Sequence, residues 1–418
     1  MRVPLEPHYG FTIPSIHDDT TLDCRIYHPD IFDNVTRGDT RESLWRKRGI
    51  VMAHPYAPMG GSYDDRVVGI VVDEMLKAGY IVGTFNFRGA HGSKHKGRTS
   101  WSGRPELDDY ASFAACFMQY MSLIRPFPEP NAKFAPEQSS ARQAREKSST
   151  VLSDKAPLVV LGGYSYGSLI LKHLPPVPSI LQRFSNPLAG SAADEVLLRA
   201  QKMADQSNLE WINHARDAER NKRAKKHEYR PSLTIGGEET SPDKRRSSRE
   251  VQRSLDIPRG LDIGQRLRSL SHRGRRHENS VESLDQAEVN VAIPEVRYLL
   301  VSPLTPPIST LAAPALSQKP WSRSEDTTSI IGKFVSLAIY GDQDIFASAK
   351  KIRDWSDHLR AQYGPTFSSV EITGAGHFWV EQGVEKQLRT ALKKWSNEIS
   401  SGRTERSKSQ DAVPDLHV

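Results

Sequence analysis

Short apolar runs alternate with amphipathic stretches through the first half of the chain. Residues 49–53 (GIVMA) and 80–87 (YIVGTFNF) have the apolar character of buried strands. Between them, residues 64–78 carry apolar side chains at helical spacing and end at Gly79, a residue type that commonly terminates helices. This alternation predicts an α/β fold, in which a mostly parallel sheet is flanked by helices.

The same pattern continues along the rest of the chain. Pro105 is expected to begin a helix that ends at about Ile124, because proline is favoured in the first turn of a helix. A C-terminal helix is expected from about Gln382 to Ile399. Four further apolar runs predict strands, at 158–162 (LVVLG), 298–302 (YLLVS), 334–340 (FVSLAIY) and 369–373 (SVEIT).

Two polar segments interrupt the pattern and set the predicted domain organisation. Residues 128–157 are rich in Ser, Gln, Ala, Lys and Pro and predict a flexible surface excursion. Residues 175–293 form a longer insertion, with a helix at about 193–226 and then an Arg- and Ser-rich segment at about 230–286 that is too poor in apolar residues for a core. The α/β domain is then expected to consist of residues 1–127, 158–174 and 294–400. Residues 401–418 are expected to form a disordered tail.

The positive charge of the chain is concentrated in this insertion. The 418 residues carry a net charge of +7, and residues 220–276 alone contain 17 Lys or Arg against 7 Asp or Glu. The basic pI of 9.2 therefore belongs to one segment and not to the predicted α/β domain. The run RNKRAKKHEYR (220–230) has few aromatic residues and no recognisable binding fold, so we expect no specific nucleic-acid partner.

The serines among arginines in this insertion leave two interpretations open. In DKRRSSRE (243–250) and RLRSLSHR (266–273), phosphorylation would reverse the local charge, and the segment could bind a protein partner. The alternative is a solvated linker, which we favour.

Cysteine content and hydropathy indicate the compartment. Cys24 and Cys116 are the only cysteines and have no disulfide or metal-binding spacing, which fits a reducing environment. No run approaches the roughly 18 apolar residues of a membrane span, and the N-terminus lacks the apolar core of a signal peptide. We expect a cytoplasmic protein with no membrane span, a nuclear location through the basic segment being the alternative, and no metal or cofactor.

A GxSxG element lies where an apolar strand meets a helix. Residues 163–167 (GYSYG) follow the 158–162 strand directly and lead into SLILKHL. A sharp strand-to-helix turn strains the serine backbone, and glycines on both sides let the strand and helix approach each other. The Ser165 hydroxyl is therefore expected above the carboxyl edge of the sheet. An ordinary glycine-rich turn is the alternative, which the flanking strand and helix disfavour.

A nucleophilic serine needs a base, and the base needs an orienting carboxylate. Asp344 follows the 334–340 strand in YGDQD, and His377 follows the 369–373 strand in GAGH. Because the carboxyl ends of parallel strands meet at one edge of a sheet, both side chains are expected near Ser165. Asp342 is the rival carboxylate, but an Asp directly after glycine more often caps a turn, so we favour Asp344.

The remaining components are backbone donors for a developing oxyanion. The Tyr166 amide is the first candidate, because it follows the serine at the start of a helix. The second is expected from the loop at 54–61 (HPYAPMGG), where Pro55 and Pro58 have no N–H, which leaves Tyr56 as the favoured donor. Three further histidines lie in loops that follow early strands, where backbone donors are expected and not the base; these are His54, His91 and His95.

These motifs together resemble a predicted-hydrolase branch of the α/β-hydrolase superfamily, over roughly residues 48–175 and 297–380. The branch shows HPxPxxGG, NFRGxGxS, GExxD and GYSFG elements, and the matching segments here are HPYAPMGGS, FNFRGAHGS, ELDD, GYSYG, YGDQD and GAGH. The resemblance implies an α/β-hydrolase fold, which uses the chain order Ser, Asp, His, and a triad of Ser165, Asp344 and His377.

The sequence departs from the branch's pattern at three places. The segment RGAHGS (88–93) carries one residue more than usual, so the loop over the site is expected to be reshaped, with Arg88 as its structural anchor. Glu106 and Asp109 lie beside Pro105 and are expected to face the helix dipole as first-turn residues. Only residues 304–333 occupy the usual lid position, which predicts a small cap.

The resulting functional hypothesis is a serine hydrolase that cleaves a small or medium acyl ester, thioester or amide through an acyl-enzyme. An acyltransferase on the same triad is the first alternative. A catalytically silent scaffold, with the insertion binding a protein partner, is the second, and an intact Ser, Asp and His set argues against it.

Overall fold

The computed structural model of the chain describes six stretches of it, at residues 5–32, 45–92, 97–127, 156–228, 293–317 and 330–410. The chain divides into one unit formed by Met1–Arg223 and Glu288–Val418, and a second formed by Ala224–Ala287. The predicted excursion at 128–157, apart from its last two residues, and the predicted basic segment at 230–286 lie outside the described residues.

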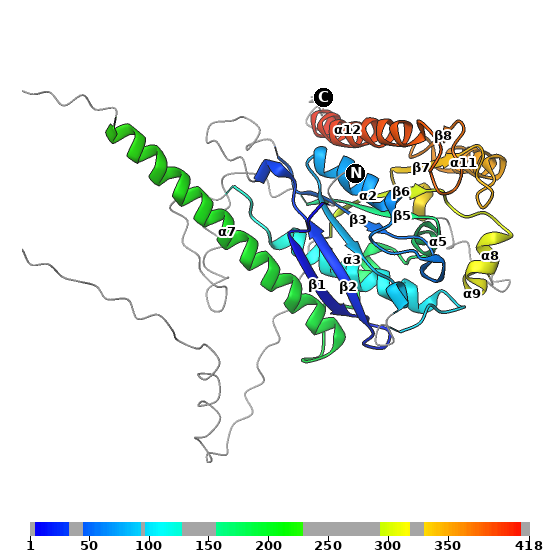
Figure 1. Cartoon of the computed structure of the whole chain (residues 1–418), viewed down its shortest axis with the longest axis horizontal. Helices are drawn as coiled ribbons and strands as arrows, with labels where there is room; N and C mark the ends of the chain where they lie inside the picture. Colours follow the sequence, from blue (N-terminus) through cyan, green and yellow to red (C-terminus); the bar gives the residue numbers. More distant parts are fainter. Residues whose placement is uncertain are drawn as a thin grey trace, which may run out of the picture. The chain divides into compact units, whose positions relative to one another are not determined.

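An eight-stranded sheet runs through the larger unit in the order β1-β2-β4-β3-β5-β6-β7-β8 (Figure 1). β1 pairs antiparallel with β2, β2 pairs antiparallel with β4, and every later pairing is parallel. This order confirms the predicted α/β-hydrolase fold class. The strands are β1 (Tyr9–Pro14), β2 (Thr21–Tyr27), β3 (Arg48–Ala53), β4 (Ile81–Phe85), β5 (Leu158–Tyr164), β6 (Glu295–Val301), β7 (Ser336–Gly341) and β8 (Phe367–Ile372).

Helices cover both faces of this sheet because its central strands are apolar on both sides. In β3, Ile50 and Met52 face one core and Val51 and Ala53 the other, which follows the alternation of side chains along a strand. The first core is closed by α2 (Arg66–Lys77) and α12 (Val384–Gln410). The second is closed by α3 (Arg104–Leu123) and α5 (Tyr166–Lys172), with α11 (Ala349–Tyr363) packed on β8. No helix in the described ranges has both the length and the apolar character needed to cross a membrane.

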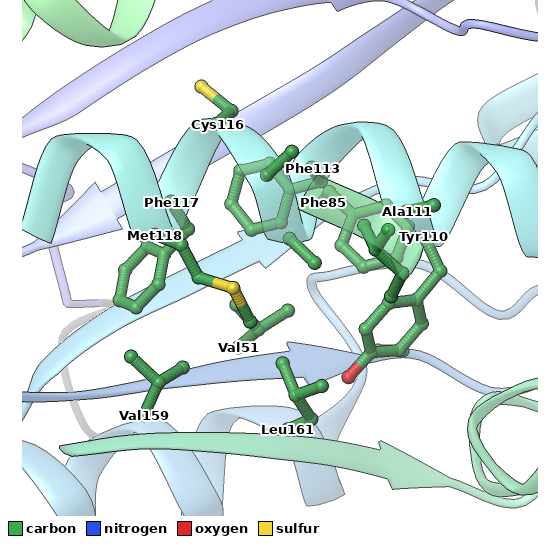
Figure 2. Packing of buried hydrophobic residues seen from close by; sticks show 14 of the residues in the cluster. Val51, Phe85, Tyr110, Ala111, Phe113, Cys116, Phe117, Met118, Val159 and Leu161 are labelled. Carbon is green, nitrogen blue, oxygen red and sulfur yellow. The ribbon is translucent and has the colours of Figure 1, made fainter. Parts of the chain in front are cut away.

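Aromatic side chains of α3 pack closely on the strands beneath it. Figure 2 shows the rings of Phe113, Phe117 and Tyr110 lying over the side chains of Val51 and Leu161. These rings fit because the strands carry glycine below them: a Cβ on Gly49 or Gly83 would lie 2.8 or 2.7 Å from the Phe117 ring. The two glycines therefore set how closely α3 approaches the sheet.

The hairpin formed by β1 and β2 was not among the strands expected from the sequence. Its second strand, TLDCRIY, buries Leu22, Cys24 and Ile26 in alternation with half-exposed residues. The sequence signal of this strand is therefore an apolar residue at every second position, whereas the expected strands are continuous apolar runs.

Part of the insertion predicted at 175–293 packs on the main core. α6 (Val177–Gln182) and the first turns of α7 (Ala192–Glu228) pack into the main core, where Val196, Ala200 and Ala204 are fully buried. The Tyr9 hydroxyl also lies 2.8 Å from Ser207 Oγ, which ties α7 to the edge strand β1. The apolar stripe on α7, which lies within the predicted insertion, therefore packs on the core.

The C-terminal helix is also longer than expected. α12 continues to Gln410, so the first ten residues of the predicted disordered tail (401–418) are helical. Gly402 does not end the helix, because an isolated glycine costs only about 1 kcal/mol and extending an existing helix avoids the cost of nucleation.

The contact between Phe117 and the strand glycines gives a stability prediction. Gly83→Ala should lower the free energy of unfolding by about 1–3 kcal/mol in chemical denaturation, because the added methyl overpacks the ring. Adding Phe117→Leu should recover part of that loss. Gly10→Ala is the matched control, since nothing lies within 4 Å of a Cβ there; equal losses for Gly83 and Gly10 would contradict the role given to this contact.

Candidate active site

Ser165 occupies a strained turn between β5 and α5. Its backbone has φ 55° and ψ −113°, a region that side chains other than glycine rarely adopt. A Cβ on Gly163 would lie 2.3 Å from the carbonyl carbon of Gly167, and one on Gly167 would lie 2.7 Å from the Ala53 oxygen. Both glycines of GYSYG are therefore needed for the turn, as the sequence pattern predicts.

The structure brings Ser165, His377 and Asp344 into one chain of contacts. His377 Nε2 lies 2.8 Å from Ser165 Oγ, and His377 Nδ1 lies 2.8 and 2.9 Å from the two Asp344 carboxylate oxygens. All three residues are 6–8% exposed, so water screens these contacts little. The distances are those of a nucleophile, a general base and an orienting carboxylate.

The loop after β7 separates the two candidate carboxylates. Asp344 Oδ1 accepts hydrogen bonds from the backbone N–H groups of Phe346 and Ala347, at 2.8 and 2.9 Å, which fixes the carboxylate toward His377. Asp342 instead accepts from the Gly374 N–H at 2.7 Å and so joins this loop to the one after β8. The structure thus places Asp344, and not Asp342, beside the imidazole.

The imidazole of His377 is held from several sides. The backbone oxygen of His377 accepts a hydrogen bond of 2.8 Å from the Tyr164 hydroxyl. The Tyr164 ring stacks on the imidazole, with an interplanar angle of 29° and centroids 5.7 Å apart. The Phe346 ring meets it edge-on at 4.8 Å. These contacts leave the ring little rotational freedom, as a base that must keep one orientation requires.

The two residues expected to supply oxyanion donors, Tyr166 and Tyr56, are in contact through their side chains. Tyr166 is the first residue of α5, so its N–H has no acceptor within the helix. Tyr56 caps the short helix η2 (Ala57–Met59), and its carbonyl oxygen accepts from the N–H groups of Met59 and Gly61. The two tyrosine rings pack with centroids 5.0 Å apart, which couples the positions of both segments.

His54 supports the loop that carries Tyr56, a role that the sequence analysis did not predict. It is fully buried; its Nδ1 donates to the Pro55 oxygen at 2.6 Å, and its Nε2 accepts from the Phe87 N–H at 2.8 Å. Since a carbonyl can only accept and an N–H can only donate, these contacts require the neutral Nδ1–H tautomer. Burial accordingly lowers the pKa of His54 to about 4.

Arg88 anchors the neighbouring loop through a buried ion pair. Its guanidinium donates to both Asp109 oxygens, at 2.7 and 2.9 Å, and also reaches Asp18 and Ser15. Glu106 accepts from the Ser100 backbone N–H and hydroxyl, both at 2.6 Å. Glu106 lies in the first turn of α3, as expected, whereas Asp109 lies beyond that turn. Both are fully buried and organise loops, because buried charges need partners.

Among the described residues, no three or more His, Cys, Asp or Glu side chains are grouped so that they could hold a metal ion. The chemistry that the described side chains themselves offer lies in the Ser165, His377 and Asp344 contacts.

The buried His54 gives a pH prediction. The folded-state pKa of His54, about 4, lies below the ordinary value of about 6.5. As the pH falls, the imidazole of the unfolded chain is therefore protonated before that of the folded chain. The corresponding stability is present above pH ~6.5 and is lost as the pH falls toward 4, by about 3 kcal/mol in total. His54→Gln should therefore flatten the dependence of unfolding free energy on pH across that window. The exposed His358→Gln serves as control, and an unchanged slope in His54→Gln would contradict the assignment.

Comparison with known proteins finds only distant similarity, to solved structures. No family model and no curated protein matches the sequence. Solved structures of similar architecture include an α/β serine hydrolase homologue from Coxiella burnetii (14% identity, TM-score 0.40, covering 93% of this chain and 98% of that one). A second is an α/β serine hydrolase without lid from Xanthomonas campestris (13% identity, TM-score 0.41, covering 94% of this chain and 95% of that one). A third is a putative α/β hydrolase from Agrobacterium tumefaciens (13% identity, TM-score 0.42, covering 98% of this chain and 100% of that one). At this distance no activity transfers to this chain, which has the α/β-hydrolase fold.

Proposed function

We propose that this protein is a serine hydrolase that cleaves an acyl ester, thioester or amide of a small-molecule substrate through an acyl-enzyme. The observation that carries the proposal is the continuous hydrogen-bonded path from Ser165 Oγ through the His377 ring to the Asp344 carboxylate. Buried triads of this geometry convert a weak hydroxyl nucleophile into an effective one.

In the first half-reaction, His377 Nε2 accepts the hydroxyl proton as Ser165 Oγ attacks the acyl carbon. Asp344 accepts a hydrogen bond from Nδ1–H, which keeps Nε2 free to act as the base and stabilises the imidazolium that forms. The backbone N–H groups of Tyr166 and Tyr56 donate to the tetrahedral oxyanion. Collapse of the intermediate passes the proton from His377 to the leaving group.

In the second half-reaction, water takes the place of the leaving group. His377 removes a proton from that water as it attacks the acyl carbon, and then returns the proton to Ser165 Oγ when the acid product leaves. With the substrate and one water molecule, the chain's own residues balance both steps.

Two other functions use the same fold. An acyltransferase would share every step up to the acyl-enzyme and differ in admitting an acceptor alcohol, amine or thiol in place of water. A silent scaffold would have no need for a strained serine and a buried imidazole aligned on a buried carboxylate, and each of these costs stability. We therefore favour a hydrolase.

Labelling tests the nucleophile. A fluorophosphonate probe should label the native protein at Ser165, as read by intact mass and peptide mapping, because the probe reacts only with a serine activated by a base. Ser165→Ala should remove the label while the circular dichroism spectrum stays native. Heat-denatured parent is the control for nonspecific reaction. Labelling of the variant at the rate of the parent would exclude this nucleophile.

A pair of carboxylate variants tests the acid member. Asp344→Asn should lower kcat for p-nitrophenyl acetate by roughly 10³- to 10⁴-fold, because the amide no longer holds the tautomer in which Nε2 is the base. Asp342→Asn is the matched control: it removes the charge but keeps an oxygen that can accept from the Gly374 N–H, and it should lower kcat by less than about tenfold. The opposite ranking, at equal thermal stability, would assign the triad carboxylate to Asp342.

A further inference from the structure

Exposed apolar side chains gather around the loops that carry the triad. In the part of the chain that the structure describes, twelve large apolar side chains are exposed, and six of them lie in these loops or beside them. Such clustering is unusual on a soluble surface and marks a binding site. We call these six residues the apolar rim: Met59, Trp101, Leu311, Ile345, Phe378 and Val380.

The apolar rim is continuous with the proposed catalytic residues. Ile345 follows Asp344 directly, and Phe378 follows His377. The Phe378 ring lies 5.5 Å from the His377 ring and 6.0 Å from the Phe346 ring, and Phe346 itself meets the imidazole. An apolar path therefore begins at the base and leads outward to solvent.

Trp101 is exposed on a loop that is firmly anchored. Its side chain is 77% exposed, yet Ser100 beside it is bound by the buried Glu106 through both its N–H and its hydroxyl. Two residues further on, a Cβ on Gly103 would lie 2.9 Å from the side chains of Ala313 and Leu316, so the loop packs closely there. The exposure of Trp101 is therefore built into the structure and is not the result of a loose loop.

The helices α8 (Ile308–Ala312) and α9 (Pro314–Ser317) connect the loop of Trp101 with the loop that carries Asp344. Leu311 is 64% exposed on α8, which packs on α5, the helix that begins after Ser165 (Figure 1). The Ser348 N–H donates to the Thr305 hydroxyl at 3.1 Å, which ties the segment before α8 to the loop of Asp344. The rim residues thus come from segments that are joined to one another around the site.

We propose that the apolar rim binds an apolar chain or ring of the substrate, so that the preferred substrates are esters or thioesters with an acyl or alcohol part of more than about six carbons. This substrate class rests on the proposed function. Each methylene fully buried against the rim raises kcat/KM by about fourfold, so a chain of six to eight carbons gains far more than an acetyl group even where contact is partial.

A chain-length series tests the proposal. For the parent, kcat/KM should rise at least about 20-fold from p-nitrophenyl acetate to p-nitrophenyl octanoate. The double variant Trp101→Ser/Leu311→Ser should lower the octanoate-to-acetate ratio at least about fivefold. The matched control is Ile293→Ser/Phe334→Ser, two side chains that are 58% and 40% exposed and precede β6 and β7, at the opposite edge of the sheet. The control should keep the parent ratio.

The outcomes separate this proposal from the proposed function. Hydrolysis that depends on Ser165 but shows a flat chain-length profile would overturn the rim proposal alone. If no ester is hydrolysed, calorimetry measures the Kd of p-nitrophenyl octanoate for Ser165→Ala with and without the Trp101→Ser/Leu311→Ser substitutions. A Kd that rises at least about fivefold with these substitutions supports the rim proposal, and an unchanged Kd overturns it. A concentration-dependent dimer that the rim variant abolishes, with a flat profile, would identify the patch as an interface between two copies of the chain.

Discussion

The strained backbone of Ser165 is the feature on which the rest of the site depends. A positive φ at a residue other than glycine costs on the order of 1–3 kcal/mol and persists only where surrounding contacts impose it. Here the Ser165 N–H donates to the Val301 oxygen on β6 at 2.9 Å, and Ser168 Oγ donates to the Gly163 and Val301 oxygens. With β5 in the middle of the sheet and cores on both faces, the turn cannot relax without disturbing both cores.

The parallel sheet converts distant sequence positions into one constellation. β5, β7 and β8 end at the same edge, so the loops that carry Ser165, Asp344 and His377 emerge together. Direct bonds then join the loops: the Gln343 N–H donates to the Ala375 oxygen at 3.0 Å, and the Tyr164 hydroxyl donates to the His377 oxygen. The geometry of the proposed triad is thus held by the backbone as well as by its own side chains, and such preorganisation is what the proposed acyl transfer would need.

Behind the proposed oxyanion donors lies a set of buried polar residues with a supporting role. His54 fixes the segment before Tyr56, while the Arg88 and Asp109 pair and Glu106 fix the loops on either side of it. Buried groups of this kind add little net stability, because their interactions first offset the cost of removing them from water. Their benefit is a defined loop geometry, and the exposed Trp101 of the apolar rim owes its fixed position to the same Glu106 contact.

The sequence by itself determined the fold class, the strand-turn-helix at Ser165 and the candidates Asp344 and His377, because these depend on local patterns: apolar runs, glycines in a turn and polar residues just after strands. The choice of Asp344 over Asp342 was favoured from turn preferences, but only the tertiary structure shows which carboxylate faces the imidazole. The docking of α7, the Arg88 and Asp109 pair and the apolar rim were likewise decided by tertiary contacts. The residues that contact each other in these features lie from about twenty to about two hundred positions apart in the sequence. Their burial and pairing depend on how the sheet brings distant segments together, which no local sequence pattern records.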